Sequence, residues 1–101
     1  MTANEIRQQF YTVSITYTNE CDELKIFHLT DYCTTNEQRN KLITDATQFM
    51  IDDDFEIHNI SIAIATDSAV KQYLDEIIRY ECDENSCVYD CMQILVKLLL
   101  N

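Results

Sequence analysis

The sequence contains no glycine and no proline among its 101 residues. Average usage would give roughly a dozen of the two together in a chain of this length. Phosphate-binding P-loops and dinucleotide-binding fingerprints both require glycine, so neither motif is present. Turns must instead be made by Asn, Asp, Ser and Thr, whose side chains hydrogen-bond to the nearby backbone.

Basic residues are also scarce. The chain has 7 Lys and Arg against 18 Asp and Glu, which gives a net charge of −11. Such a charge repels nucleic acids and anionic membranes, so we expect no direct binding to DNA, RNA or a membrane. It favours a basic protein as partner, although net charge also serves simply to keep a small protein soluble.

A secretion signal and a long apolar run are likewise missing. The N-terminal MTANEIRQQF has no basic segment followed by an apolar one, and no apolar stretch has the length of a membrane span. The 5 cysteines are an odd number, which fits reduced thiols better than a disulfide framework. We expect a cytoplasmic protein with a single domain over residues 1–101.

Two strands are predicted in the N-terminal third. In FYTVSITYT (10–18), aromatic and β-branched residues alternate with Thr and Ser, the pattern of a half-buried strand with one face in water. LKIFHLT (24–30) follows the polar turn NECDE (19–23), and so short a link predicts an antiparallel hairpin.

A third strand is predicted at FEIHNISIAIAT (55–66). The alternation places Ile60 and Ile62 on one face and Ile57 on the other. Because both faces are largely apolar, we expect this strand to be the central one of the sheet.

Three amphipathic helices complete the pattern. Thr34 or Thr35 is the expected N-cap of the first, with Glu37 or Gln38 as its reciprocal partner. The apolar stripes expected to be buried are Leu42, Ile43, Ala46, Phe49 and Met50 in the first helix, Val70, Tyr73, Leu74, Ile77 and Ile78 in the second, and Val88, Cys91, Met92, Leu95, Leu98 and Leu99 in the third.

The ends of these helices are predicted from the same chemistry. We expect the first helix to stop before the triplet Asp52–Asp54, because the helix dipole disfavours anions at a C-terminus. Asp67 or Ser68 would cap the second helix, and Asn85 or Ser86 the third. The predicted fold is α+β, in the order ββαβαα, with a three-stranded, mainly antiparallel sheet packed on one face by helices.

RYECDENSCVYDC (79–91) raises the question of a metal or redox site. Cys82, Cys87 and Cys91 lack the paired spacing of a zinc knuckle, and His28 and His58 lie far away on predicted strands, where we expect them to be tucked into the core. The surrounding acids would raise the thiol pKa values and suppress reactivity. We therefore expect structural cysteines, no metal and no cofactor.

The acidic segments do not fit a calcium loop or a catalytic site either. An EF-hand that started at Asp52 would need Gly where Ile57 stands and Glu where Ala63 stands. Adjacent acids at the end of an element are normally solvated, whereas acid–base catalysis needs a pocket and a raised pKa. We do not expect an enzyme, and we predict no catalytic residue.

The acids gather in three runs at predicted loops and element ends, where binding residues concentrate. Tyrosines flank the last run, and tyrosine is enriched at protein interfaces, although these residues would serve equally well at the rim of the core. The candidate partner-binding residues are Glu20, Asp22, Glu23, Asp52, Asp53, Asp54, Glu56, Glu81, Asp83, Glu84, Tyr80 and Tyr89. If two runs lay on one side, their carboxylates would imitate the phosphates of a nucleic acid.

The runs NECDE, IDDDFE and YECDEN, in a small chain without catalytic motifs, resemble the general character of phage-encoded inhibitors of host defence, especially anti-CRISPR proteins and nucleic-acid mimics. The resemblance covers the size, the charge and the lack of catalytic motifs along the whole chain, and it involves no shared motif. It implies a stoichiometric inhibitor that acts in the host-cell cytoplasm. Its partner would be a CRISPR effector, and it would block the groove for guide RNA or target DNA.

Two alternatives remain open at this stage. An immunity protein that neutralises a basic nuclease toxin would also be small and acidic. A self-associating structural domain is the other, because MQILVKLLLN (92–101) has more leucine than one helix face needs. The surplus would fill either the core or the seam of a homodimer formed through the C-terminal helix.

Overall fold

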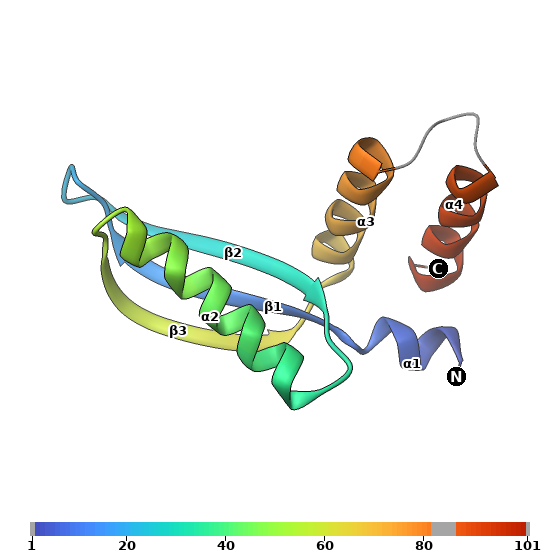
Figure 1. Ribbon diagram of the computed structural model, residues 1–101, viewed down its shortest axis with the longest axis horizontal. Helices are drawn as coiled ribbons and strands as arrows, with labels where there is room; N and C mark the ends of the chain where they lie inside the picture. The colour runs from blue at the N-terminus through green and yellow to red at the C-terminus, as the bar shows by residue number, and fades with distance from the viewer. Residues whose placement is uncertain (1, 82–86, 101) are drawn as a thin grey trace.

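The computed structural model describes residues 2–81 and 87–100, apart from the side chains of Glu81 and of residues 87–89. Its elements are α1 (Ala3–Arg7), β1 (Phe10–Thr18), β2 (Leu24–Tyr32), α2 (Asn36–Asp52), β3 (Glu56–Ile64), α3 (Asp67–Glu81) and α4 (Cys87–Leu100) (Figure 1). The α+β class and the order ββαβαα are confirmed. The short helix α1 was not predicted, since its 5 residues are too few to show a helical period.

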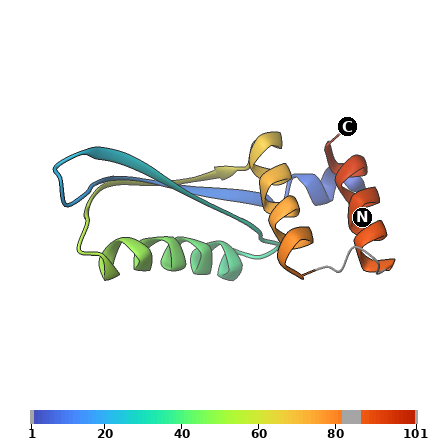
Figure 2. The ribbon, with the colours of Figure 1, turned by 90° about the horizontal axis from the view of Figure 1, so that it is seen from above.

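The strands form an antiparallel sheet in the order β2-β1-β3. The hairpin prediction is therefore correct, but the prediction that the third strand is central is wrong, because β1 lies between the other two. Among the described residues, α2 covers one side of the sheet and no helix lies over the other, so the central strand β1 needs only one apolar face (Figure 2). The Thr and Ser residues of β1 lie on that open side.

A register irregularity explains why the prediction placed Ile57 on the wrong face of the third strand. Tyr17 pairs with Ile57 while Thr16 pairs with Asn59, so His58 is an extra residue in β3. The bulge turns Ile57 to the same face as Ile62, where both pack against the core, instead of to the opposite face. His58 lies exposed on the open face and shares a hydrogen bond of 2.6 Å with Thr18, so it is not tucked into the core.

Helix α2 covers the apolar face of the sheet as a separate layer (Figure 2). Thr35 caps it by accepting a hydrogen bond from the Gln38 N–H, as predicted. The Gln38 side chain reaches back to accept from the N–H of Thr34, one residue before the N-cap, and not from Thr35 as a regular capping box would require. Val13 and Ile15 of β1 are fully buried beneath it, a contribution of about 1.5–3 kcal/mol each. Of the predicted stripe of α2, Leu42, Ala46 and Met50 are buried against the sheet and Ile43 is partly buried. Phe49 is 54% exposed, so its assignment to the buried stripe is wrong.

A second apolar cluster joins α1, α3 and α4 at the other end of the sheet, around Phe10 and Val70. Arg7 ties α1 to this cluster by donating to the Ala65 carbonyl and to the Asp67 carboxylate, both at 2.7 Å. The N-terminus of α3 is capped by the Thr66 hydroxyl, which accepts from the Ala69 N–H, and not by Asp67 or Ser68 as predicted. Asp67 instead forms the ion pair with Arg7.

Helix α4 packs through Leu99, with Met92, Leu95 and Val96 partly buried beside it. Cys91 is exposed, so its assignment to the buried stripe is wrong, and Leu98 is exposed as well. Of the described helices, none has both the length and the apolar character that crossing a membrane would require. The predicted caps of this helix, Asn85 and Ser86, lie outside the described residues.

Candidate functional site

The turn between β1 and β2 is held by the side chain of Asn19. Its oxygen accepts hydrogen bonds from the N–H groups of Cys21 and Glu23, at 2.9 and 3.0 Å. The backbone of Asn19 pairs with Glu23 and accepts from Asp22. Asp22 takes the left-handed conformation, with φ of 60°, at a position where hairpins of this kind normally have glycine. The turn is therefore ordered although it contains three acids.

The junction between α2 and β3 is ordered in a similar way. The Phe55 N–H donates to the Met50 carbonyl, and the Asp54 N–H donates to the Ile51 carbonyl. These two bonds define a Schellman motif, in which the left-handed residue is usually glycine. Here it is Asp54, with φ of 58°. Helix α2 includes Asp52 and has Asp53 as its C-cap, so the prediction that the helix stops before the triplet is wrong.

The two acidic segments meet at one end of the sheet. Glu56 pairs with Thr18, the last residue of β1, and Phe55 stacks on Tyr17 with ring centroids 5.0 Å apart. Phe55 also lines a shallow recess together with Asn19, Glu20 and Cys21. We call this region the acidic end, and it consists of Glu20, Asp22, Glu23, Asp52, Asp53, Asp54 and Glu56.

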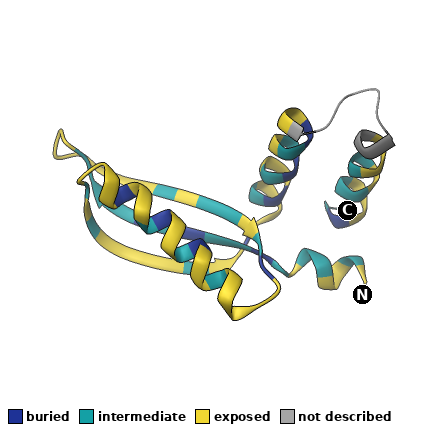
Figure 3. Cartoon of the chain, viewed as in Figure 1, coloured by how far each residue is buried: buried dark blue, intermediate teal, exposed yellow. Residues whose placement is uncertain are grey.

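All seven residues of the acidic end are exposed. In Figure 3 the turns at the left of the molecule are coloured as exposed. Few interactions neutralise these carboxylates from outside the group. Lys25 lies 4.0 Å from Glu23, and the amide of Gln48 donates to Asp52 at 2.7 Å. Seven negative charges with one nearby lysine create a strong negative potential that extends from this end into solvent.

The third predicted acidic run does not belong to this group. Tyr80 and Glu81 end α3, which lies at the opposite end of the long axis from the acidic end (Figure 1). The Tyr80 side chain is 78% exposed and lies at the surface. Asp83 and Glu84 lie outside the described residues, as does the side chain of Tyr89.

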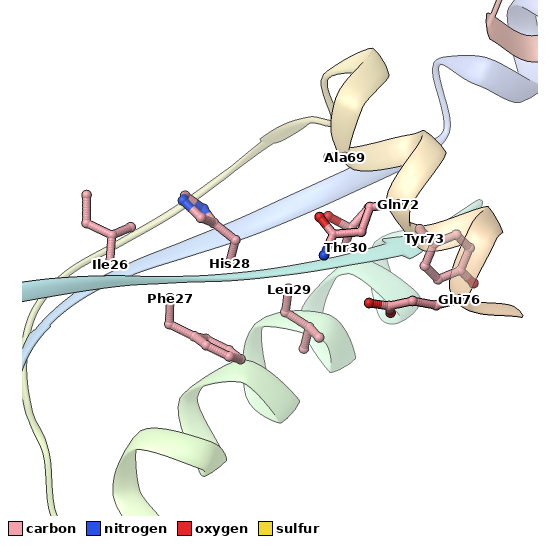
Figure 4. A pocket seen from close by; sticks show the side chains of 9 residues that line it. All are labelled: Ile26, Phe27, His28, Leu29, Thr30, Ala69, Gln72, Tyr73 and Glu76. Carbon is pink, nitrogen blue, oxygen red and sulfur yellow. The ribbon is translucent and has the colours of Figure 1, made fainter. Parts of the chain in front are cut away.

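Sequence patterns missed a cleft between β2 and α3. It has a volume of about 350 Å³ and is lined by Ile26, Phe27, His28, Leu29, Thr30, Ala69, Gln72, Tyr73 and Glu76. In Figure 4, His28 points to one side of β2, whereas Phe27 and Leu29 point to the other, toward α2. His28 is therefore exposed on the open face, contrary to prediction, and its ring shares a 2.8 Å hydrogen bond with Ser14. The alternation correctly places His28 on the same face of β2 as Leu24 and Ile26, but both of those residues are exposed too.

Tyr73 fixes one wall of this cleft. Its hydroxyl donates to the Asp31 carboxylate at 2.8 Å and so joins α3 to β2. Burial, followed by this hydrogen bond to Asp31, raises the pKa of Tyr73 well above its ordinary value. The hydroxyl therefore keeps its proton at neutral pH and acts as a structural donor.

The cysteines of the described region differ in their surroundings. Cys33 is buried, and burial, with a smaller effect of Asp31, raises the pKa of its thiol, which makes it unreactive. Cys21 and Cys91 are exposed. Within residues 2–81 and 87–100, no three His, Cys, Asp or Glu side chains are grouped as a metal site would require.

Comparisons with known proteins leave the site to be interpreted on its own geometry. No protein-family model, no curated protein sequence and no solved structure matches the chain.

Proposed function

We propose that this protein is an inhibitor that binds, through its acidic end, to a basic surface of a nucleic-acid-binding protein. The supporting observation is the position of the acids. Asp22 and Asp54 occupy left-handed positions suited to glycine, and Asp52 and Asp53 stand at a helix C-terminus, where the dipole disfavours anions. Acids placed against the local preferences of the backbone indicate a requirement outside folding.

The geometry suits docking onto a positively charged groove. Carboxylates from two segments far apart in sequence project from two hydrogen-bonded turns, so little conformational freedom is lost when they bind. Opposite potentials would make the association fast and sensitive to salt. The stacked pair Tyr17 and Phe55 stiffens the base of the acidic end.

The resemblance to anti-CRISPR proteins makes a CRISPR effector the proposed partner, with the acidic end in the channel for guide RNA or target DNA. A basic nuclease toxin would present the same chemistry to the same surface. The two partners are distinguished by which protein is inhibited: an RNA-guided effector loses binding of guide or target, whereas a toxin loses cleavage of any nucleic acid.

The decisive experiment compares two adjacent charge reversals. The variant Asp52→Lys with Asp53→Lys changes the acidic end, and the control Asp75→Lys with Glu76→Lys makes the same change of charge on α3. Both pairs lie on helix surfaces, and the ion pair between Lys71 and Asp75 that the control removes is exposed and contributes little. Each variant is titrated against purified effector at low and high salt, with inhibition and complex formation as readouts.

We expect the first variant to lose inhibition and complex formation while its melting temperature is equal to or higher than that of the wild type, because lysine is favoured over aspartate at a helix C-terminus. The control should inhibit like the wild type, and wild-type binding should weaken steeply with salt. Full inhibition by the first variant, or loss of inhibition only in the control, would show that the acidic end is not the binding surface.

A further inference from the structure

Strand β3 has a free outer edge. It is the last strand on its side of the sheet, and Figure 1 shows its outer side free of α1, α3 and α4. The opposite edge strand, β2, is bordered by α3 along the cleft and is tied to it through Tyr73 and Asp31. Strand β3 has no such cover among the described residues, and its sequence EIHNISIAI contains no lysine and no proline. Natural proteins normally use such residues or covers to prevent edge pairing.

The backbone groups at this edge follow from the register. The Ala65 N–H donates to the Phe10 carbonyl at 2.8 Å, so Ala65 belongs to a hydrogen-bonded pair with β1. Because residues alternate in direction along an antiparallel strand, Ala63 and Ser61 also face β1. Ile60, Ile62 and Ile64 therefore direct their N–H and C=O groups outward, away from the sheet.

The side chains of the same three residues lie on the face that α2 covers. Ile62 is partly buried there, but Ile60 and Ile64 remain 40% and 54% exposed, because α2 contacts β3 less than it contacts β1 and β2. The edge thus combines unpaired backbone groups with two exposed isoleucines.

We propose that β3 pairs with β3 of a second copy of this chain, in an antiparallel register centred on Ile62. This register pairs Ile60 with Ile64 of the second copy, Ile62 with its own equivalent, and Ile64 with Ile60. Every outward-facing backbone group of these residues then has a partner. The two exposed isoleucines of one copy lie directly opposite those of the other and cover them. The bulge at His58 lies outside this stretch, so the paired segment is regular.

Charge is compatible with this arrangement despite the net charge of −11 on each copy. The register places the two Glu56 residues on opposite sides of the two-fold axis, about 40 Å apart along the strand direction at roughly 3.3 Å per residue. That distance exceeds the Debye length of about 8–10 Å at physiological salt several times over. The two acidic ends therefore diverge, and the dimer presents them at its two extremities.

The test is the mass of the reduced full-length chain in solution as a function of concentration, measured by sedimentation or light scattering. Ile64→Lys places a charge at the proposed seam. Ile26→Lys is the matched control, because Ile26 is a similarly exposed isoleucine, at 60%, on the other edge strand. Leu98→Lys tests the alternative seam on α4, where Leu98 is 61% exposed.

We expect the wild type, Ile26→Lys and Leu98→Lys to approach twice the chain mass of 11.9 kDa, and Ile64→Lys to remain monomeric. Amide hydrogen exchange of the wild type gives an independent readout that requires no variant. The amides of Ile60, Ile62 and Ile64 should gain protection as concentration rises, while other edge amides do not. A monomer at all concentrations, a dimer lost only in Leu98→Lys, or dimerisation without protection of these amides would overturn the proposal.

Discussion

Replacing Asp54 by glycine should make the protein more stable. Asp54 is the left-handed residue of the Schellman motif, with φ of 58°. An L-residue pays about 1–2 kcal/mol for this conformation, and aspartate lies at the low end because its short polar side chain bonds locally. Glycine pays none of this cost in the folded state.

Two further contributions determine how much the free energy of unfolding increases. Removing an anion from the end of a helix contributes about 0.3–1 kcal/mol, and the greater freedom of unfolded glycine subtracts about 0.5–1 kcal/mol. The free energy of unfolding should therefore rise by about 0.3–1.5 kcal/mol. For a domain of this size that corresponds to an increase of about 1–12 °C in melting temperature.

Thermal unfolding followed by circular dichroism measures the effect, and two further variants are compared with Asp54→Gly. Asp54→Asn removes the charge and tolerates the same backbone, so it should gain only the electrostatic part. Asp45→Gly makes the same replacement in the middle of α2, and it should lower stability by about 0.5–1 kcal/mol, because glycine is the poorer helix former and the ion pair with Lys41 is lost. If Asp54→Gly proved no more stable than the wild type, Asp54 would not be locally unfavourable. Its presence would then give no support to a role in binding.

The other predictions concern Tyr73 and the cysteines. Because the pKa of Tyr73 is raised in the folded state, its contribution to stability is complete below the ordinary tyrosine pKa of about 10 and is lost as pH rises above that value. The stability difference between wild type and Tyr73→Phe, measured by urea unfolding, should be constant from neutral pH to about 10 and shrink above it; a constant difference up to higher pH would refute the assignment. Cys21 should react with iodoacetamide in the native protein while Cys33 stays unmodified until the protein unfolds, as peptide mass spectrometry can show. Equal labelling of both thiols would mean that local opening of the native protein readily exposes Cys33.

Local chemistry was enough to predict most elements. The strict alternation in β1 and the cap formed by Thr35 and Gln38 depend only on neighbours in sequence, and both are present in the structure. The helix end at Asp52 was predicted wrongly because the dipole term is small. The two hydrogen bonds of the Schellman motif and the packing of Met50 and Phe55 outweigh it.

Strand order could not be predicted in the same way. The apolar character of β3 suggested a central strand, yet β3 is apolar on one face because α2 lies over it and the bulge turns Ile57 inward. Ile60 and Ile64 pair with Ile15 and Tyr11 of β1 but remain exposed, because β3 is an edge strand and no further strand of the described residues lies beside it. Long-range pairing, not local pattern, decided which strand is central.

The convergence of the acids follows from topology once the pairing is known. Because β3 runs antiparallel to β1, the start of β3 must lie where β1 ends, and therefore beside the turn that leads to β2. This brings Asp54 and Asp22, the positive-φ residues of the described chain, to the same end of the sheet. In a chain without glycine, the two positions that most favour glycine are both occupied by aspartate. At this end of the sheet the lack of glycine and the excess of acid therefore coincide, and two hydrogen-bonded turns hold the charges on which the proposed binding depends.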